Sequence, residues 1–243
     1  MQQYAKEVHK PALKRYPRRV VKAFEVDHIW ATDLLDMHEF ADENKGYNFI
    51  LVTIDLFTRY ARVVPLKGKS GEVVAEGMRT LFKKRVPYYL WSDQGKEYTG
   101  KVFQALLNKY GVGHYHTYSE HKAVRAERFN KTLKSRIYRH ITETDDLHWV
   151  KYLQAICDEY NKSYNEAIEM SPAVAQTGEH NEMILQKQEE LEAKLGEQKD
   201  PKFAPGQKVR MSRLKKLFEK SYRPVGRGSV RSVGSLIMRH RLR

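Results

Sequence analysis

Apolar residues run together or alternate with polar ones in five short stretches, and each stretch predicts a β-strand. The first three lie at about residues 26–35, 47–56 and 60–66. Only a short joint separates the second from the third, which favours an antiparallel meander. The last two, at about residues 88–91 and 112–116, are shorter. These five stretches predict one sheet.

Helical spacing of apolar residues appears between and after the later strands. It predicts one helix from about Val73 to Phe82 and a second with an apolar side made of Val102, Phe103, Leu106, Leu107 and Tyr110. Two more helices are expected at about residues 123–141 and 147–160. A three-stranded meander followed by helix–strand–helix–strand and further helices is typical of an RNase H-like α/β domain. We therefore expect a mixed five-stranded sheet flanked by helices.

Composition divides the chain into four parts. Residues 1–24 form a basic arm interrupted by prolines, and residues 25–178 carry the predicted α/β core. Residues 179–200 are predicted to be a charged helical linker. In residues 201–243, the stretch Phe203–Met211 predicts the opening strand of a small β-barrel, whereas Val225–Arg243 offers few strands to close one.

The net charge of +14 over 243 residues is concentrated at the two ends. Residues 1–24 contribute +6 and residues 201–243 contribute +12, which leaves the middle at −4. Basic arms around a slightly acidic middle indicate that the arms hold a polyanion. The alternative is that the arms are solvated tails without a partner.

The single cysteine, Cys157, can form neither an internal disulfide nor a cysteine-rich zinc site, which favours a reducing compartment. No apolar run approaches the roughly 18 residues of a membrane helix. We therefore expect a soluble, intracellular protein with no membrane partner.

Three acids lie where catalytic carboxylates could converge. Asp33 is in the middle of the first predicted strand, Asp93 ends the fourth before a glycine turn, and Glu127 is one turn into a helix. Two-metal phosphodiester chemistry needs oxygen ligands from separate elements. Each acid also has a plainer interpretation: Asp33 as an edge-strand acid facing water, Asp93 as a helix cap, and Glu127 as a surface glutamate.

The combination of these acids carries a resemblance. The blocks Trp30–Leu34, Trp91–Tyr98 and Ala126–Lys134 resemble the three blocks of retroviral-type DDE integrase cores, with 59 and 33 residues between the acids. Together with Asp55–Ala61 and Ser212–Lys220, they look most like integrases of Maverick/Polinton-type DNA transposons. The resemblance covers roughly residues 9–224.

The resemblance implies a nuclear DDE integrase or transposase that works as at least a dimer. Asp33, Asp93 and Glu127 would be the catalytic triad and would hold Mg²⁺ or Mn²⁺, two ions per site. The implied reactions are 3′-end processing and strand transfer, which integrate the DNA of a mobile element. The residues expected to bind that DNA are Lys131, Lys134, Tyr118, Arg128, Arg18, Arg19, Arg213, Lys215 and Lys216.

The predicted helix around Glu127 has two distinct sides. One should pack inward and contains Ala126, Phe129, Leu133, Ile137 and Ile141. Glu127, Lys131, Lys134 and Tyr138 stack on another side, an arrangement suited to gripping a DNA end. Simple Glu–Lys pairing one turn apart is the alternative.

Other polar residues are expected to be structural. Asp55 should cap the turn after its strand, and Asp27 and Asp36 belong to strand ends. His114 and His116 receive no catalytic role.

Two features depart from the integrase pattern. No His/Cys zinc domain is visible ahead of the core, and the SH3-like C-terminal segment is incomplete. They leave two alternatives open: a catalytically impaired or domesticated remnant that only binds DNA, and a nuclease that cuts without joining.

Overall fold

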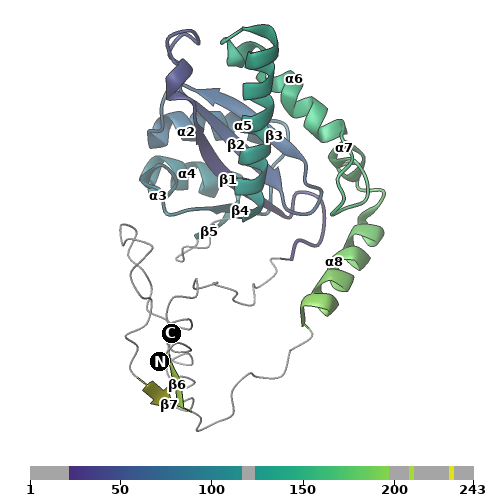
Figure 1. Cartoon of the computed structure of the whole chain (residues 1–243). Coiled ribbons are helices and arrows are strands. Elements are labelled where there is room, and N and C mark those ends of the chain that lie inside the picture. The colour runs from purple at the N-terminus through teal and green to yellow at the C-terminus, as the bar shows by residue number, and fades with distance from the viewer. Residues whose placement is uncertain (1–21, 117–123, 197–207, 211–229, 233–243) are drawn as a thin grey trace, which may run out of the picture. The chain divides into compact units, whose positions relative to one another are not determined.

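The computed structural model describes residues 22–116, 124–196, 208–210 and 230–232. Val21–Leu191 cluster into one compact unit, which contains the predicted core (Figure 1). Strands β6 (Lys208–Arg210) and β7 (Val230–Ser232) belong to a separate unit and pair antiparallel with each other. Most of the expected SH3-like segment lies outside the described residues, so that expectation and the four domain limits remain predictions.

The compact unit is built on one five-stranded sheet with the strand order β3-β2-β1-β4-β5. Its strands are β1 (Ile29–Asp36), β2 (Phe49–Asp55), β3 (Ala61–Leu66), β4 (Tyr89–Ser92) and β5 (Gly113–His116). β1, β2 and β3 form the expected antiparallel meander, while β4 joins β1 and β5 joins β4 in parallel. The mixed sheet is therefore confirmed.

One face of the sheet is covered by α2 (Gly71–Phe82), the short α3 (Lys96–Thr99) and α4 (Lys101–Tyr110). Trp30, Leu51 and Leu90 point from the sheet into this core. Helix α2 approaches the sheet closely at Gly77, because a Cβ atom there would lie 2.8 Å from Cδ2 of Leu66.

The other face is covered by α5 (Val124–Thr144), which crosses the sheet in Figure 1, and by α6 (Trp149–Lys162). Ile29, Ala31 and Val52 point into this second core. Asn161 of α6 joins the helix to the sheet edge, since its side chain accepts from N–H of Ala61 and donates to its carbonyl, at 2.8 and 2.9 Å. The chain continues through α7 (Pro172–Ala175) and α8 (Asn181–Gly196), the expected charged helix.

The predicted elements are confirmed with small shifts of their ends, and two details differ. The sequence patterns did not predict the short helices η1 (His38–Phe40), α3 and α7. Val102 was expected on the apolar side of its helix but is 44% exposed. The helical repeat explains this, because Val102 lies about a quarter turn from the centre of the stripe formed by Phe103, Leu106 and Leu107.

No helix within the described ranges is long and apolar enough to cross a membrane.

Candidate active site

Asp33 lies on the α5 face of the sheet. Ile29 and Ala31 of β1 point into the core beneath α5, and alternation along the strand places Asp33 on the same face. Its side chain is partly buried. Oδ2 accepts a hydrogen bond from Nδ2 of Asn130 at 2.8 Å, and Oδ1 accepts one from N–H of Leu34 at 2.9 Å. The carboxylate is thus oriented by both the strand and α5.

Asp93 is brought beside Asp33 by the parallel pairing of β1 and β4. Ala31 pairs with Trp91, and each aspartate follows two residues later in its own strand direction. Trp91, like Ala31, packs on the α5 side, so the same face is expected to carry both acids. Oδ1 of Asp93 accepts from N–H of Gly95 at 3.0 Å, which fixes the carboxylate to the turn that starts α3.

Glu127 is in the first turn of α5, the helix that packs across β1 and β2. Its backbone lies one turn before Asn130, the residue that bonds Asp33. Residues three apart in a helix share a side, so the helix turn that carries Glu127 is held next to Asp33. The side chain of Glu127 lies outside what the structure describes.

Two residues near the acids were missed by the sequence analysis. Tyr98 is only 1% exposed, and burial raises the pKa of its phenol well above the ordinary value, with the charges of Asp33, Asp93 and Glu97 raising it further. Tyr98 is therefore within electrostatic range of all three carboxylates. The carboxylate of Glu97 folds back over the turn, because a Cβ atom at Gly95 would lie 2.6 Å from its Oε1. Both Tyr98 and Glu97 lie in the same sequence block as Asp93, which is the signal that could have found them.

His114 supports the end of β4. Its Nε2 lies 2.9 Å from Oγ of Ser92, and its Nδ1 lies 2.8 Å from Nε2 of Gln104. These bonds join β4, β5 and α4 just before Asp93, which agrees with the structural role expected of His114.

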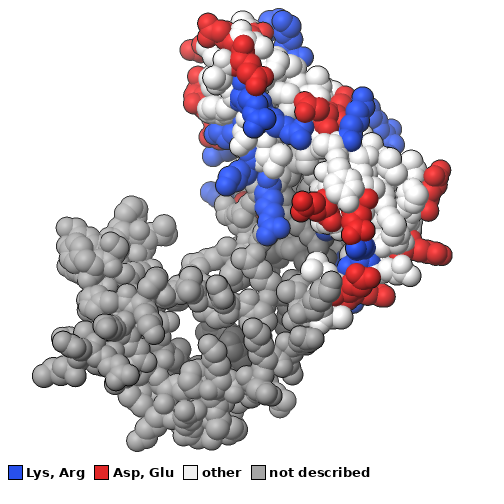
Figure 2. All heavy atoms as spheres, turned by 45° about the vertical axis from the view of Figure 1, so that its right-hand side comes forward, with Lys and Arg blue, Asp and Glu red and all other residues white. Residues whose placement is uncertain are grey.

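The inner side of α5 is as predicted, since Ala126, Phe129, Leu133 and Ile137 are all buried. Arg128 and Lys131 are exposed, and Lys134 is partly exposed with Nζ 4.0 Å from Oε1 of Glu39. Figure 2 shows a broken band of basic side chains down one side of the core, with acidic side chains beside it. The remaining predicted DNA contacts lie outside the described residues: Tyr118, Arg18, Arg19, Arg213, Lys215 and Lys216.

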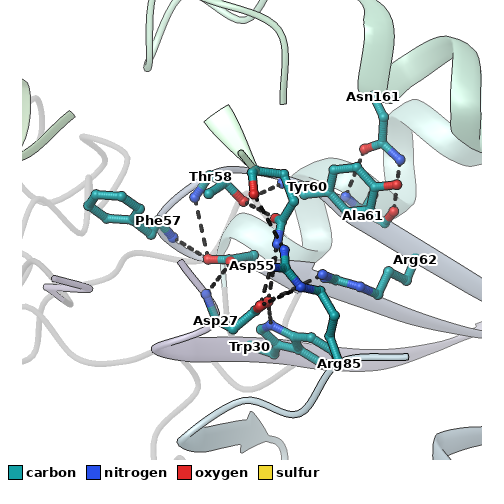
Figure 3. Close-up of polar contacts among 11 residues, drawn as sticks. Asp27, Trp30, Asp55, Phe57, Thr58, Tyr60, Ala61, Arg62, Arg85 and Asn161 are labelled. Carbon is teal, nitrogen blue, oxygen red and sulfur yellow. Dashed lines mark hydrogen bonds and ion pairs between the residues drawn. The ribbon is translucent and has the colours of Figure 1, made fainter. Parts of the chain in front are cut away.

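Asp27 and Asp55 belong to a separate polar network at the other end of β1 (Figure 3). Asp55 accepts from N–H of Phe57 at 2.7 Å, so the predicted cap on the turn is confirmed, and from N–H of Asp27 at 2.8 Å. Asp27 in turn pairs with Arg62 and Arg85, each at 3.2 Å. These acids are structural.

The residues at the site fit a divalent cation that takes oxygen ligands. Oδ1 of Asn130 is buried next to Asp33, and it receives no hydrogen bond in the described part of the chain. A carboxylate and a free amide oxygen are ligand types that suit Mg²⁺ or Mn²⁺. Among the described side chains no three His, Cys, Asp or Glu residues converge on one point, so Glu127 would have to supply the third carboxylate.

Residues 24–121 match the integrase core domain family. The chain is 30% identical over 188 residues to a transposon-derived protein of Caenorhabditis elegans, an alignment that covers 76% of this chain and 62% of that protein. It is 27% identical over 126 residues to the Gag-Pol polyprotein of feline leukemia virus, which covers 50% of this chain and 7% of the polyprotein. The chain therefore spans less than two thirds of the length of these relatives.

Solved structures confirm the fold. The chain superposes with a TM-score of 0.60 on a chain of the simian T-cell lymphotropic virus intasome, at 15% identity, with 72% of this chain and 66% of that chain covered. It superposes with a TM-score of 0.54 on the HTLV-2 integrase catalytic core domain solved with magnesium, also at 15% identity, with 64% and 99% covered. The chain thus has the RNase H-like fold of retroviral integrase catalytic cores.

Proposed function

We propose that this chain is a polynucleotidyl transferase that processes DNA 3′ ends and transfers them to a target strand, integrating the DNA of a mobile element. The observation that carries the proposal is the parallel β1–β4 register, because its continuation past Ala31 and Trp91 would bring Asp33 and Asp93 to matching positions on one face of the sheet. The match of residues 24–121 to the integrase core family supports it. The residues in the sequence blocks resemble those of Maverick/Polinton integrases, which favours an element of that type.

Asp33, Asp93 and Glu127 would hold two Mg²⁺ or Mn²⁺ ions, and the magnesium in the HTLV-2 core structure supports this choice of metal. Such ions activate the attacking oxygen and stabilise the leaving one in an in-line displacement. Asn130 orients the carboxylate of Asp33, and the N–H of Gly95 orients that of Asp93. Both acids are therefore positioned before substrate arrives, which is the condition for efficient electrostatic catalysis.

DNA would lie along the exposed side of α5. Arg128, Lys131 and Lys134 lie about one, two and three turns beyond the start of that helix and would contact phosphates. Tyr118 and the basic arms, through Arg18, Arg19, Arg213, Lys215 and Lys216, would extend the contact. Because phosphate contacts release counterions, binding should be strongly salt-dependent. The working form would be at least a dimer, and the site of action the nucleus.

A disintegration assay tests the proposal. The chain is incubated with Mn²⁺ and a branched DNA that mimics an integration product, and strand rejoining is measured. Asp93→Asn should lose rejoining while keeping its DNA affinity, whereas Asp42→Asn, an exposed acid in the loop before β2, should behave as wild type. DNA binding without rejoining in all three proteins would refute the enzyme and leave a DNA-binding remnant. Hydrolysis products alone would indicate a nuclease that does not join.

A further inference from the structure

An uninterrupted row of aromatic side chains lies at the edge of the sheet beside the candidate active site. The row consists of Phe24, His28, Tyr88, Tyr89 and Tyr115. Ring centroids are 5.3 Å apart for Phe24 and His28, 5.7 Å for His28 and Tyr89, and 4.9 Å for Tyr89 and Tyr115. Tyr88 joins the row at 6.3 Å from His28.

The row is unusually open to solvent for side chains of this size. Phe24 is 56% exposed, Tyr88 61% and Tyr115 51%. Among the described elements, β5 packs mainly against β4 and α4, and α4 belongs to the opposite face. A contiguous set of exposed rings marks a binding surface, whereas single exposed aromatics are ordinary.

One end of the row, at Tyr115, lies toward the acids. Tyr89 and Trp91 lie on the α5 face of β4, and Tyr115 is the strand partner of Trp91 on β5. Asp93 follows Trp91 by two residues on the same face. A rise of about 3.3 Å per residue and a spacing of about 4.8 Å between strands place Tyr115 about 8 Å from Asp93 along the sheet.

Basic residues flank the other end of the row. The exposed segment between α2 and β4 contains Lys83, Lys84 and Arg85, and two residues separate Arg85 from Tyr88. Arg85 is fixed there by its ion pair with Asp27, whose carbonyl accepts from N–H of Tyr88 at 3.0 Å. Exposed rings next to fixed positive charge are the two components of a surface that binds single-stranded nucleic acid.

We infer that the aromatic row binds unpaired nucleobases of the DNA strand that enters or leaves the active site. Tyr88 and Tyr115 offer exposed rings for bases to stack on, and the Lys83–Arg85 turn faces the phosphates. A duplex presents phosphates and base edges instead of base faces, so the row should select a strand that has separated from its complement. This inference rests on the proposed function, because it names part of the substrate of that same site.

The test uses the full chain, without divalent metal, and fluorescently labelled single strands of about twelve nucleotides, with and without bases. Tyr88→Leu and Tyr115→Leu should each weaken binding of the base-bearing strand roughly 5- to 150-fold, the range measured for loss of one stacking ring. Tyr88→Phe should bind like wild type. So should Tyr164→Leu, which removes a ring that is 67% exposed and does not belong to the row. The abasic strand should bind more weakly than the base-bearing strand and should not distinguish these proteins.

Tryptophan fluorescence gives a second readout. Trp30 and Trp149 are fully buried, so quenching by a base-bearing strand should come from Trp91 and should vanish in Trp91→Phe. The inference is overturned if the leucine variants bind base-bearing strands as tightly as wild type. It is also overturned if those variants change only self-association in sedimentation, which would make the row an interface between two copies.

The two proposals fail separately. Base-dependent binding needs no metal, so a chain that stacks bases but never rejoins DNA refutes the proposed function alone. If the chain rejoins DNA but the leucine variants of the row bind base-bearing strands like wild type, only the inference about base stacking is refuted.

Discussion

Replacing Arg62 should destabilise the five-stranded unit strongly, although the side chain can be exchanged for one of similar length. Its side chain is only 10% exposed, and Nη2 lies 3.2 Å from Oδ1 of Asp27. Its guanidinium also stacks 4.0 Å from the ring centroid of Trp30 and 4.8 Å from that of Tyr60. Arg62→Met keeps much of the apolar stem and removes the charge.

The expected loss in the free energy of unfolding is about 3 kcal/mol. Removing one partner of a buried ion pair costs about 3–5 kcal/mol, because the other charge stays buried. The lower end applies here, since Arg85 still pairs with Asp27 at 3.2 Å and Asp55 keeps its backbone N–H donors. Adding Asp27→Asn should restore at least about 1 kcal/mol, because it removes the carboxylate left without Arg62. Asparagine also tolerates the positive φ of 59° at this position.

Urea unfolding followed by tryptophan fluorescence measures these changes. Arg79→Met is the matched control, because Arg79 pairs with Glu76 on an exposed face of α2 and should cost less than about 0.5 kcal/mol. A loss below about 1 kcal/mol for Arg62→Met, or a double variant as unstable as the sum of the two single ones, would refute the reasoning.

The loss of unfolding free energy in Arg62→Met should also depend on pH. Burial raises the pKa of Asp55, and the positive charge of Arg62 opposes that rise. A folded-state pKa above the unfolded value means that Asp55 destabilises the fold as pH rises through the folded pKa. Without Arg62 that pKa rises further. The destabilisation by Arg62→Met should therefore be full at neutral pH and become smaller as the pH falls through the folded-state pKa of Asp55.

Three further outcomes are expected. Burial raises the pKa of Cys157 to about 12, so its thiol should react with iodoacetamide at least about 100-fold more slowly in the folded protein than in urea. Lys131→Ala should reduce the slope of log affinity for DNA against log salt by about one, whereas Lys109→Ala on α4 should leave it unchanged. Asn130→Ala should slow metal-dependent rejoining about 10- to 100-fold without loss of DNA affinity, because Asp33 loses the donor that orients it, and Asn108→Ala should have no effect.

The order and type of the main elements could be predicted because the hydrophobic period changes from two to 3.6 where strands give way to helices. The stripe on α5 is the clearest case, since four of its five predicted residues are buried and Ile141 is partly buried. The elements that could not be predicted were very short helices. Helix η1 has three residues and helices α3 and α7 have four each, too few to show a period.

For the site, the sequence could supply candidates but not their neighbours. The spacing and blocks pointed to Asp33, Asp93 and Glu127, but no period in the sequence reveals that Nδ2 of Asn130 bonds Asp33 across 97 positions. Tyr98 was missed for a similar reason, because its burial and its electrostatic interaction with Asp33 arise only in the folded chain. Contacts between distant segments depend on the fold, and a single sequence does not display them.

The two groups of aspartates are linked by the register of the sheet. The backbone of the Asp27 segment receives the start of β4, because N–H of Tyr88 donates to the carbonyl of Asp27 and N–H of Tyr89 to that of His28, both at 3.0 Å. A slip of one residue between β1 and β4 would turn Asp93 to the opposite face of the sheet. The buried network around Asp27 therefore supports the site through register and without touching it. Arg62→Met should accordingly reduce rejoining only in proportion to the fraction of molecules that unfold.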